Sequence, residues 1–162
     1  MRYSEVVNYL RDTSKGLGYD VTFFHGRTPN AQLVKNIKTI YVMLLPFKSR
    51  GTGKTSTSNV DETYNLNMIV YMQDRVDSGI NRNASDVLQK EMEILDQTWY
   101  IATQLERKID DNNITPKLQR ASDLLQLKTF DKEASVKDTA MLLTGTTINM
   151  TIKIPDQFNY CC

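Results

Sequence analysis

The sequence predicts an α+β domain: a mainly antiparallel sheet of about four to five strands, with one long helix and an N-terminal helix packed on one face. Residues 64–73 alternate between apolar and polar side chains, which is the period of a strand with one buried face. Residues 83–111 repeat apolar side chains at steps of three and four, which is the period of an amphipathic helix. No repeat or low-complexity linker divides the chain, so we expect one domain over residues 1–155 and a contact tail at 156–162.

The strand at 64–73 and the long helix form the centre of this predicted fold. The apolar face of the strand consists of Leu66, Met68, Val70 and Met72. The apolar stripe of the helix consists of Leu88, Met92, Leu95, Trp99, Ala102, Leu105 and Ile109. Asn83 is placed to cap the first turn of the helix. We expect the whole stripe to pack against the sheet, with Trp99 and Tyr100 contributing to the core.

The N-terminal part predicts one helix and two strands. Residues 3–15 carry apolar side chains at helical spacing, and Gly16 and Gly18 end the helix. A short strand is expected at 21–24. A second strand is expected at 39–45, where both faces are apolar, so we expect this strand to lie in the middle of the sheet.

Residues 48–59 predict the longest loop of the chain, because they contain mostly Ser, Thr, Gly, Lys and Arg. No helical segment separates the strand before this loop from the strand after it. The simplest topology is therefore a long hairpin that joins residues 39–45 to residues 63–73 as antiparallel neighbours.

The C-terminal part predicts two further strands. A short helix is expected around 116–122, a weak strand at 124–130 and a hairpin loop at 131–138. Residues 146–154 alternate almost without interruption and predict a strand with one buried face. Its polar face is rich in Asn and Thr, like that of residues 64–73. We therefore expect one sheet face to be polar, and either solvated or in contact with another subunit.

Charge is unevenly distributed along a chain whose net charge is only +1. Residues 21–60 contain no acidic side chain, yet they contain Arg27, Lys35, Lys38, Lys48, Arg50 and Lys54. The helix at 83–111 contains seven acidic and three basic side chains, a net charge of −4. The two blocks are expected either to meet across a subunit boundary or to form two separate solvated faces.

Several classes of protein are disfavoured by the sequence. No apolar run approaches the roughly 20 residues of a membrane span, and the first residues do not open a signal peptide. We therefore expect a protein of the cytoplasm without membrane contact. The two cysteines, Cys161 and Cys162, are adjacent and are expected to remain reduced thiols, since neighbouring cysteines bridge only with strain.

One segment is similar to a phosphate-binding loop. Residues 48–55 end in the Gly-Lys-Thr of a P-loop, but Lys48 takes the place of the first glycine. The segment also leads into a strand rather than into a helix whose amides would hold phosphates. We expect a basic hairpin loop here, with nucleotide binding ranked third among the possible functions.

No other set of residues predicts catalysis. His25 is the single histidine, and it stands at the end of a predicted strand without a nucleophile motif nearby. The acidic residues of the long helix lack the spacing of a metal-ligand set. We expect a protein that is not an enzyme and that has no cofactor and no metal site.

A pattern of features runs through the whole chain. It comprises an N-terminal helix ending in a glycine loop, an apolar strand closed by Pro46, a polar loop, and a Tyr-x-Leu-x-Met-x-Val strand ending in Met72-Gln73-Asp74. A long helix opening at Asn83 follows, then an amphipathic strand and the ending Pro155, Asn159, Tyr160 and Cys161. This pattern resembles a small family of neck or tail-completion ring proteins of tailed bacteriophages, such as the crAss-like phages, with a tail-terminator-like fold. The lysine-rich stretch 48–54 departs from the family pattern.

The resemblance implies a structural virion subunit, made in the host cytoplasm, that forms a ring of six or twelve copies between portal and tail. Its partners would be portal-side adaptor and tail proteins. We expect Lys48, Arg50 and Lys54 to contact an adjoining ring, or the channel DNA without sequence preference. We expect Phe158 and Tyr160 to dock on a neighbouring protein. The alternative is a small intracellular protein-binding module that uses the polar sheet face.

Overall fold

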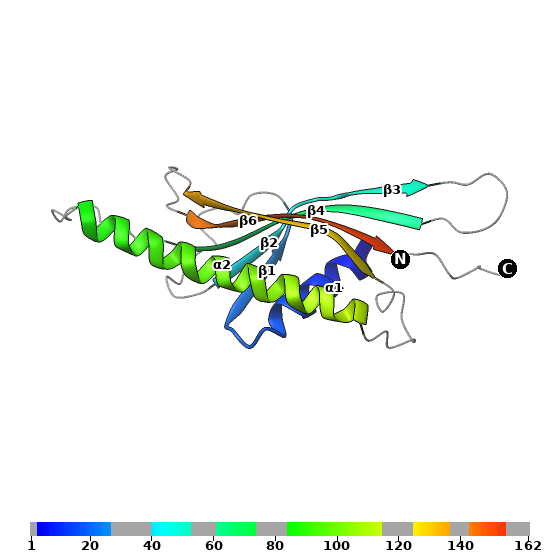
Figure 1. Cartoon of the computed structure of the whole chain (residues 1–162), viewed down its shortest axis with the longest axis horizontal. Helices are drawn as coiled ribbons and strands as arrows, with labels where there is room; N and C mark the ends of the chain where they lie inside the picture. The colour runs from blue at the N-terminus through cyan, green and yellow to red at the C-terminus, as the bar shows by residue number, and fades with distance from the viewer. Residues whose placement is uncertain are drawn as a thin grey trace.

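The computed structural model describes residues 3–26, 40–52, 61–73, 84–114, 125–136 and 143–154, which form two helices and six strands (Figure 1). The helices are α1 (Tyr3–Lys15) and α2 (Ala84–Ile114). The strands are β1 (Val21–His25), β2 (Ile40–Leu44), β3 (Lys48–Thr52), β4 (Asp61–Gln73), β5 (Gln126–Val136) and β6 (Leu143–Ile154). The predicted α+β class is confirmed, and the bounds predicted for the first helix agree with α1.

The six described strands form one sheet with the order β1-β2-β4-β6-β5, and β3 pairs with the first part of β4. β1 runs parallel to β2, whereas the other pairs are antiparallel, so the sheet is mixed. The predicted antiparallel pairing of the second strand with the long strand is confirmed, because β2 lies against residues 68–71 of β4. The sheet has one strand more than expected because residues 48–52, predicted as loop, form β3.

Two predicted loops are wrong in part, and both corrections have the same cause. Residues 48–52 form β3 and pair with residues 61–65 of β4, and residues 131–136 continue β5 beside β6. Both stretches are polar, so the hydrophobic alternation that predicts a strand is weak there. An outer strand needs only backbone hydrogen bonds on one side, and these do not depend on apolar side chains.

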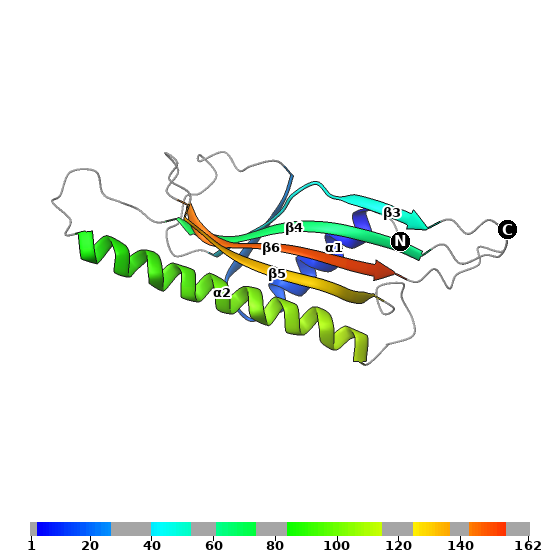
Figure 2. The ribbon, with the colours of Figure 1, turned by 45° about the horizontal axis from the view of Figure 1, so that its top comes forward.

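Both helices pack on the same face of the sheet (Figure 2), and this interface contains the main core. The helices contribute Val6, Leu10, Ile101, Ala102, Leu105 and Ile109. The three middle strands contribute Val42, Leu44, Leu66, Met68, Val70, Ile148, Met150 and Ile152. The predicted inward residues 66, 68 and 70 of β4 and 148, 150 and 152 of β6 are thus buried, and Met72 is partly buried. β2 is buried on both faces, as expected for a central strand.

The predicted apolar stripe of α2 is wrong at two positions. Met92 and Trp99 are 56% and 40% exposed, and Tyr100 is 54% exposed, so none of them belongs to the core. Thr98 faces the sheet instead, and its Oγ1 lies 3.1 Å from Oγ1 of the buried Thr146. A step of three residues back from Ala102 reaches Trp99, and a step of four reaches Thr98, so the helical period allows either residue to face the sheet. Thr98 is the smaller side chain, and it fits where helix and sheet lie close together.

The face of the sheet away from the helices is mainly polar along β4 and β6. Cross-strand pairs on this face include Asn65 with Thr151 and Asn67 with Asn149, and Thr151 Oγ1 donates to Asn65 Oδ1 at 3.1 Å. Near β2 the same face carries a small aromatic cluster of Tyr41, Met43 and Tyr71. The expected polar face is therefore present, but it covers only part of the sheet.

Tyr71 is expected to make the folded protein less stable at alkaline pH. Its side chain is buried, its ring stacks on Tyr41 at 5.3 Å, and its hydroxyl has no hydrogen-bond partner within the described chain. Burial, followed by the charge of Tyr41, raises the pKa of Tyr71 from 10.0 to about 12. Between these values the folded state holds more protons than the unfolded chain, so the free energy of unfolding falls as the pH rises from 10 to 12.

We expect Tyr71→Phe to leave stability nearly unchanged at pH 7, because it removes an unpaired buried hydroxyl. Above pH 10 the variant should lose less stability than the parent protein. Urea unfolding at pH 7, 10 and 11 measures both effects. Equal losses in the two proteins above pH 10 would show that Tyr71 does not control this dependence.

No helix in the described ranges has a stretch that is long and apolar enough to cross a membrane. The expected cap at Asn83 and the short helix at 116–122 lie outside the described residues.

Candidate interaction surfaces

Two of the three predicted loop cations share the polar face of the sheet. Arg50 pairs with Thr63 and Lys48 with Asn65, and Thr63 in turn pairs with Lys153 of β6. Directly opposed residues project to the same side of a sheet, so Lys48, Arg50 and Lys153 lie together on the side away from the helices. We call these three residues the basic sheet end.

The spacing within the basic sheet end follows from strand geometry. Lys48 and Arg50 are two residues apart on β3, about 7 Å, and Arg50 and Lys153 are two strands apart, about 10 Å. The side chains of Lys48 and Arg50 are exposed, and neither forms an ion pair with another side chain that the structure describes. Lys48 and Arg50 therefore present two exposed positive charges beside the Asn and Thr side chains of β4.

The other predicted contact residues are not placed by the structure. Lys54, Phe158 and Tyr160 lie outside the described residues. Lys153, by contrast, was not among the predicted contact residues. Lys153 lies near Arg50 because both residues pair with Thr63 of β4. This strand register cannot be read from the sequence alone.

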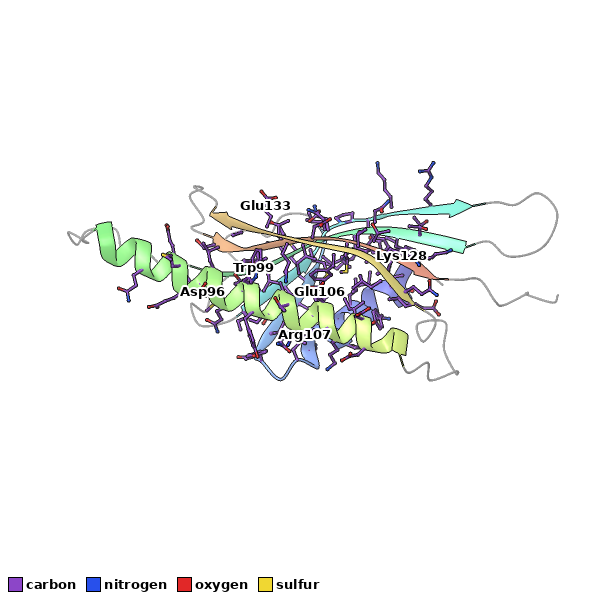
Figure 3. The ribbon with its side chains drawn as sticks, in the orientation of Figure 1. Asp96, Trp99, Glu106, Arg107, Lys128 and Glu133 are labelled. Carbon is purple, nitrogen blue, oxygen red and sulfur yellow. The ribbon has the colours of Figure 1, made fainter. Side chains whose placement is uncertain are left out.

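The second surface lies on the outer side of α2. Met92, Glu93, Asp96, Trp99 and Tyr100 follow one another at helical steps, and all five side chains are exposed. We call these five residues the acidic helix face. It combines two carboxylates with three large side chains that have apolar surface, and Figure 3 labels Asp96 and Trp99 on it. Neither Glu93 nor Asp96 forms an ion pair within the described part of the chain.

Lys132 of β5 contacts α2 at the border of the acidic helix face. It projects from β5 toward α2, and its Nζ donates to Thr103 Oγ1 at 2.9 Å and lies 3.4 Å from Glu106 Oε2. The same Nζ lies 5.2 Å from the centre of the Trp99 ring, a cation–π contact. One face of the Trp99 ring is therefore held against Lys132, while part of the side chain remains exposed.

His25 contacts three segments of the chain. Its Nδ1 donates to the backbone oxygen of Leu44 at 3.0 Å, and the Tyr3 hydroxyl donates to its Nε2 at 2.8 Å. Tyr3 also stacks on Phe47 at 4.2 Å between ring centres. These contacts connect α1 to the ends of β1 and β2.

The described residues contain no metal-ligand set, and the described start of the P-loop-like segment forms a strand. Among them, no group of three or more His, Cys, Asp or Glu side chains is placed to bind a metal ion. β3 carries the start of the P-loop-like segment and pairs antiparallel with β4, whereas a P-loop joins a strand to a helix.

No protein-family model matches the chain, and no match is found among curated proteins.

Proposed function

We propose that the chain is a structural, non-enzymatic subunit of a tailed-bacteriophage virion. In this role it forms a head-to-tail connector (neck) ring or a tail-completion ring between portal and tail. The sequence pattern described above supports this assignment. The structural observation that supports it most is the presence of two charged surfaces of opposite sign on different sides of one subunit. Two unlike, complementary surfaces favour head-to-tail contacts, which form a ring when the rotation between neighbouring copies closes.

The proposed ring contains six or twelve copies and assembles in the host cytoplasm before it becomes part of the virion. Portal-side adaptor proteins would lie on one side of it and tail proteins on the other. Lys48, Arg50 and Lys54 are the proposed contacts of the loop region, and Phe158 and Tyr160 are those of the C-terminal tail.

The mass of the purified protein at several concentrations tests the ring. Native mass spectrometry or light scattering should give one closed species of six or twelve copies, and its mass should not grow with concentration. A sixfold species would favour the tail-terminator arrangement, and a twelvefold species would favour a neck ring that follows portal symmetry. A protein that remains a monomer or stops at a dimer would contradict the ring.

A monomer or dimer would favour the second candidate, a small protein-binding module. The observation behind this candidate is the polar face of β4 and β6, where Asn and Thr side chains could exchange hydrogen bonds with a partner. A pull-down with the protein as bait would then be needed to identify that partner.

A further inference from the structure

We infer that the basic sheet end of one copy binds the acidic helix face of the next copy. This contact would be the one between neighbouring subunits, and the inference rests on the proposed ring. Lys48 and Arg50 would thus bind a neighbouring copy. From the sequence, either an adjoining ring or channel DNA was expected as their partner.

The two surfaces lie at different ends and on different sides of one copy. β3 and the start of β4 lie at one end of the long axis of the molecule, and α2 begins at the other end (Figure 1). The basic sheet end projects from the side of the sheet that the helices leave open, whereas the acidic helix face points away from the sheet. A single copy therefore cannot join its own two surfaces, and the contact has to be made between copies. After one such contact, the pair of copies still has one free surface of each kind, and each can bind a further copy.

The chemistry of the two surfaces is complementary. Glu93 and Asp96 offer carboxylates to Lys48 and Arg50, and a guanidinium can bind a carboxylate through two parallel hydrogen bonds. Trp99 and Met92 add exposed apolar area beside these carboxylates. Buried aromatic side chains and arginines are the usual anchors of protein interfaces. Because Lys132 already holds the Trp99 ring, less side-chain freedom would be lost on binding.

The same observations favour a protein partner over DNA for the basic sheet end. A DNA contact gains affinity from many phosphate neutralisations, yet this surface presents two exposed cations, Lys48 and Arg50, on a chain of net charge +1. A DNA-binding role would also leave the exposed carboxylates of α2 without a partner. A contact between copies accounts for both surfaces at once.

Charge reversal with rescue tests the inference. Lys48→Glu with Arg50→Glu should place like charges opposite each other and raise the concentration needed for assembly by about 100-fold. Glu93→Lys with Asp96→Lys should do the same. The variant with all four changes restores opposite charges in exchanged positions, so it should assemble within about tenfold of the parent concentration. Analytical ultracentrifugation at 0.1 M salt measures each protein.

A matched control separates the interface from net charge. Lys15→Glu with Lys128→Glu changes two exposed cations elsewhere and gives the same net charge, −3, as the reversal of Lys48 and Arg50. This control should assemble like the parent protein. Circular dichroism of every variant verifies that the fold is retained, since all the substituted side chains are exposed.

The outcomes distinguish the contact from the proposed ring. A ring that forms despite both reversals would overturn the contact and leave the ring standing. Rescue by the fourfold variant in a species of two copies would support the contact and contradict the ring. A parent protein that is monomeric throughout would contradict both. A reversal of Lys48 and Arg50 that abolishes binding of a labelled 30-base-pair duplex, but not assembly, would assign the basic sheet end to DNA instead.

Discussion

Gly145→Ala is expected to lower the free energy of unfolding by about 3 kcal/mol, near the upper end of the cost of overpacking a core. Gly145 lies opposite Tyr71 in the pairing of β6 with β4. A Cβ atom on Gly145 would meet the backbone oxygen of Val70 and would lie 2.7 Å from both Cα and Cβ of Tyr71. These are mostly backbone atoms of the central strand, so no side-chain rotation can make room.

Thermal unfolding measures this effect, and a loss of 3 kcal/mol should lower Tm by about 6–12 °C for a domain of this size. Asn149→Ala is the matched control, because Asn149 lies on the same strand and the same face but is exposed. The control should change stability by less than about 0.5 kcal/mol. Similar, small changes in both variants would mean that β4 and β6 do not approach each other as closely at Gly145 as described.

The second large effect is expected from the buried side of α2. Leu105 is fully buried in the core between the helices and the sheet, and Leu105→Ala should cost about 2–5 kcal/mol through lost burial and a cavity. Met92 was predicted from the sequence to lie on the same apolar stripe, but it is exposed. Met92→Ala should therefore change stability by less than about 0.5 kcal/mol.

Urea unfolding of the two variants tests the rotation of α2 about its axis. A large loss for Leu105 and almost none for Met92 is the expected pair of results. Comparable losses of unfolding free energy in both variants would mean that Met92 packs against the sheet, as the sequence predicted. If the acidic helix face is an interface, the Met92 variant should show its defect in assembly rather than in folding.

The strong periodic segments of this sequence predict their elements well. β4, β6, α1 and α2 were all identified, because each has a solvated side and a buried side and so imposes its period on the sequence. The antiparallel pairing of β2 and β4 was also predictable, since the sequence between them has no helical period. The elements that were missed, β3 and the second half of β5, are polar strands at the borders of the sheet.

The interaction surfaces could be predicted only in part. The charge blocks indicated that the loop region is basic and the long helix acidic. The addition of Lys153 to Lys48 and Arg50 depends on strand register, which one sequence does not determine. The exposure of Met92 and Trp99 depends on the rotation of α2, where a shift of one residue exchanges Trp99 for Thr98 at the sheet.

Lys132 also protects the exposed edge of β5 against pairing with a strand of another molecule. β5 is an outer strand, and such a strand can recruit a strand from another molecule and start a fibre. Here the ladder is irregular between Leu127 and Thr129, and Lys132 places an inward-pointing charge under the strand and connects it to α2. Both features are known protections against such growth. They therefore disfavour open-ended growth of the sheet from the β5 edge when many copies are close together.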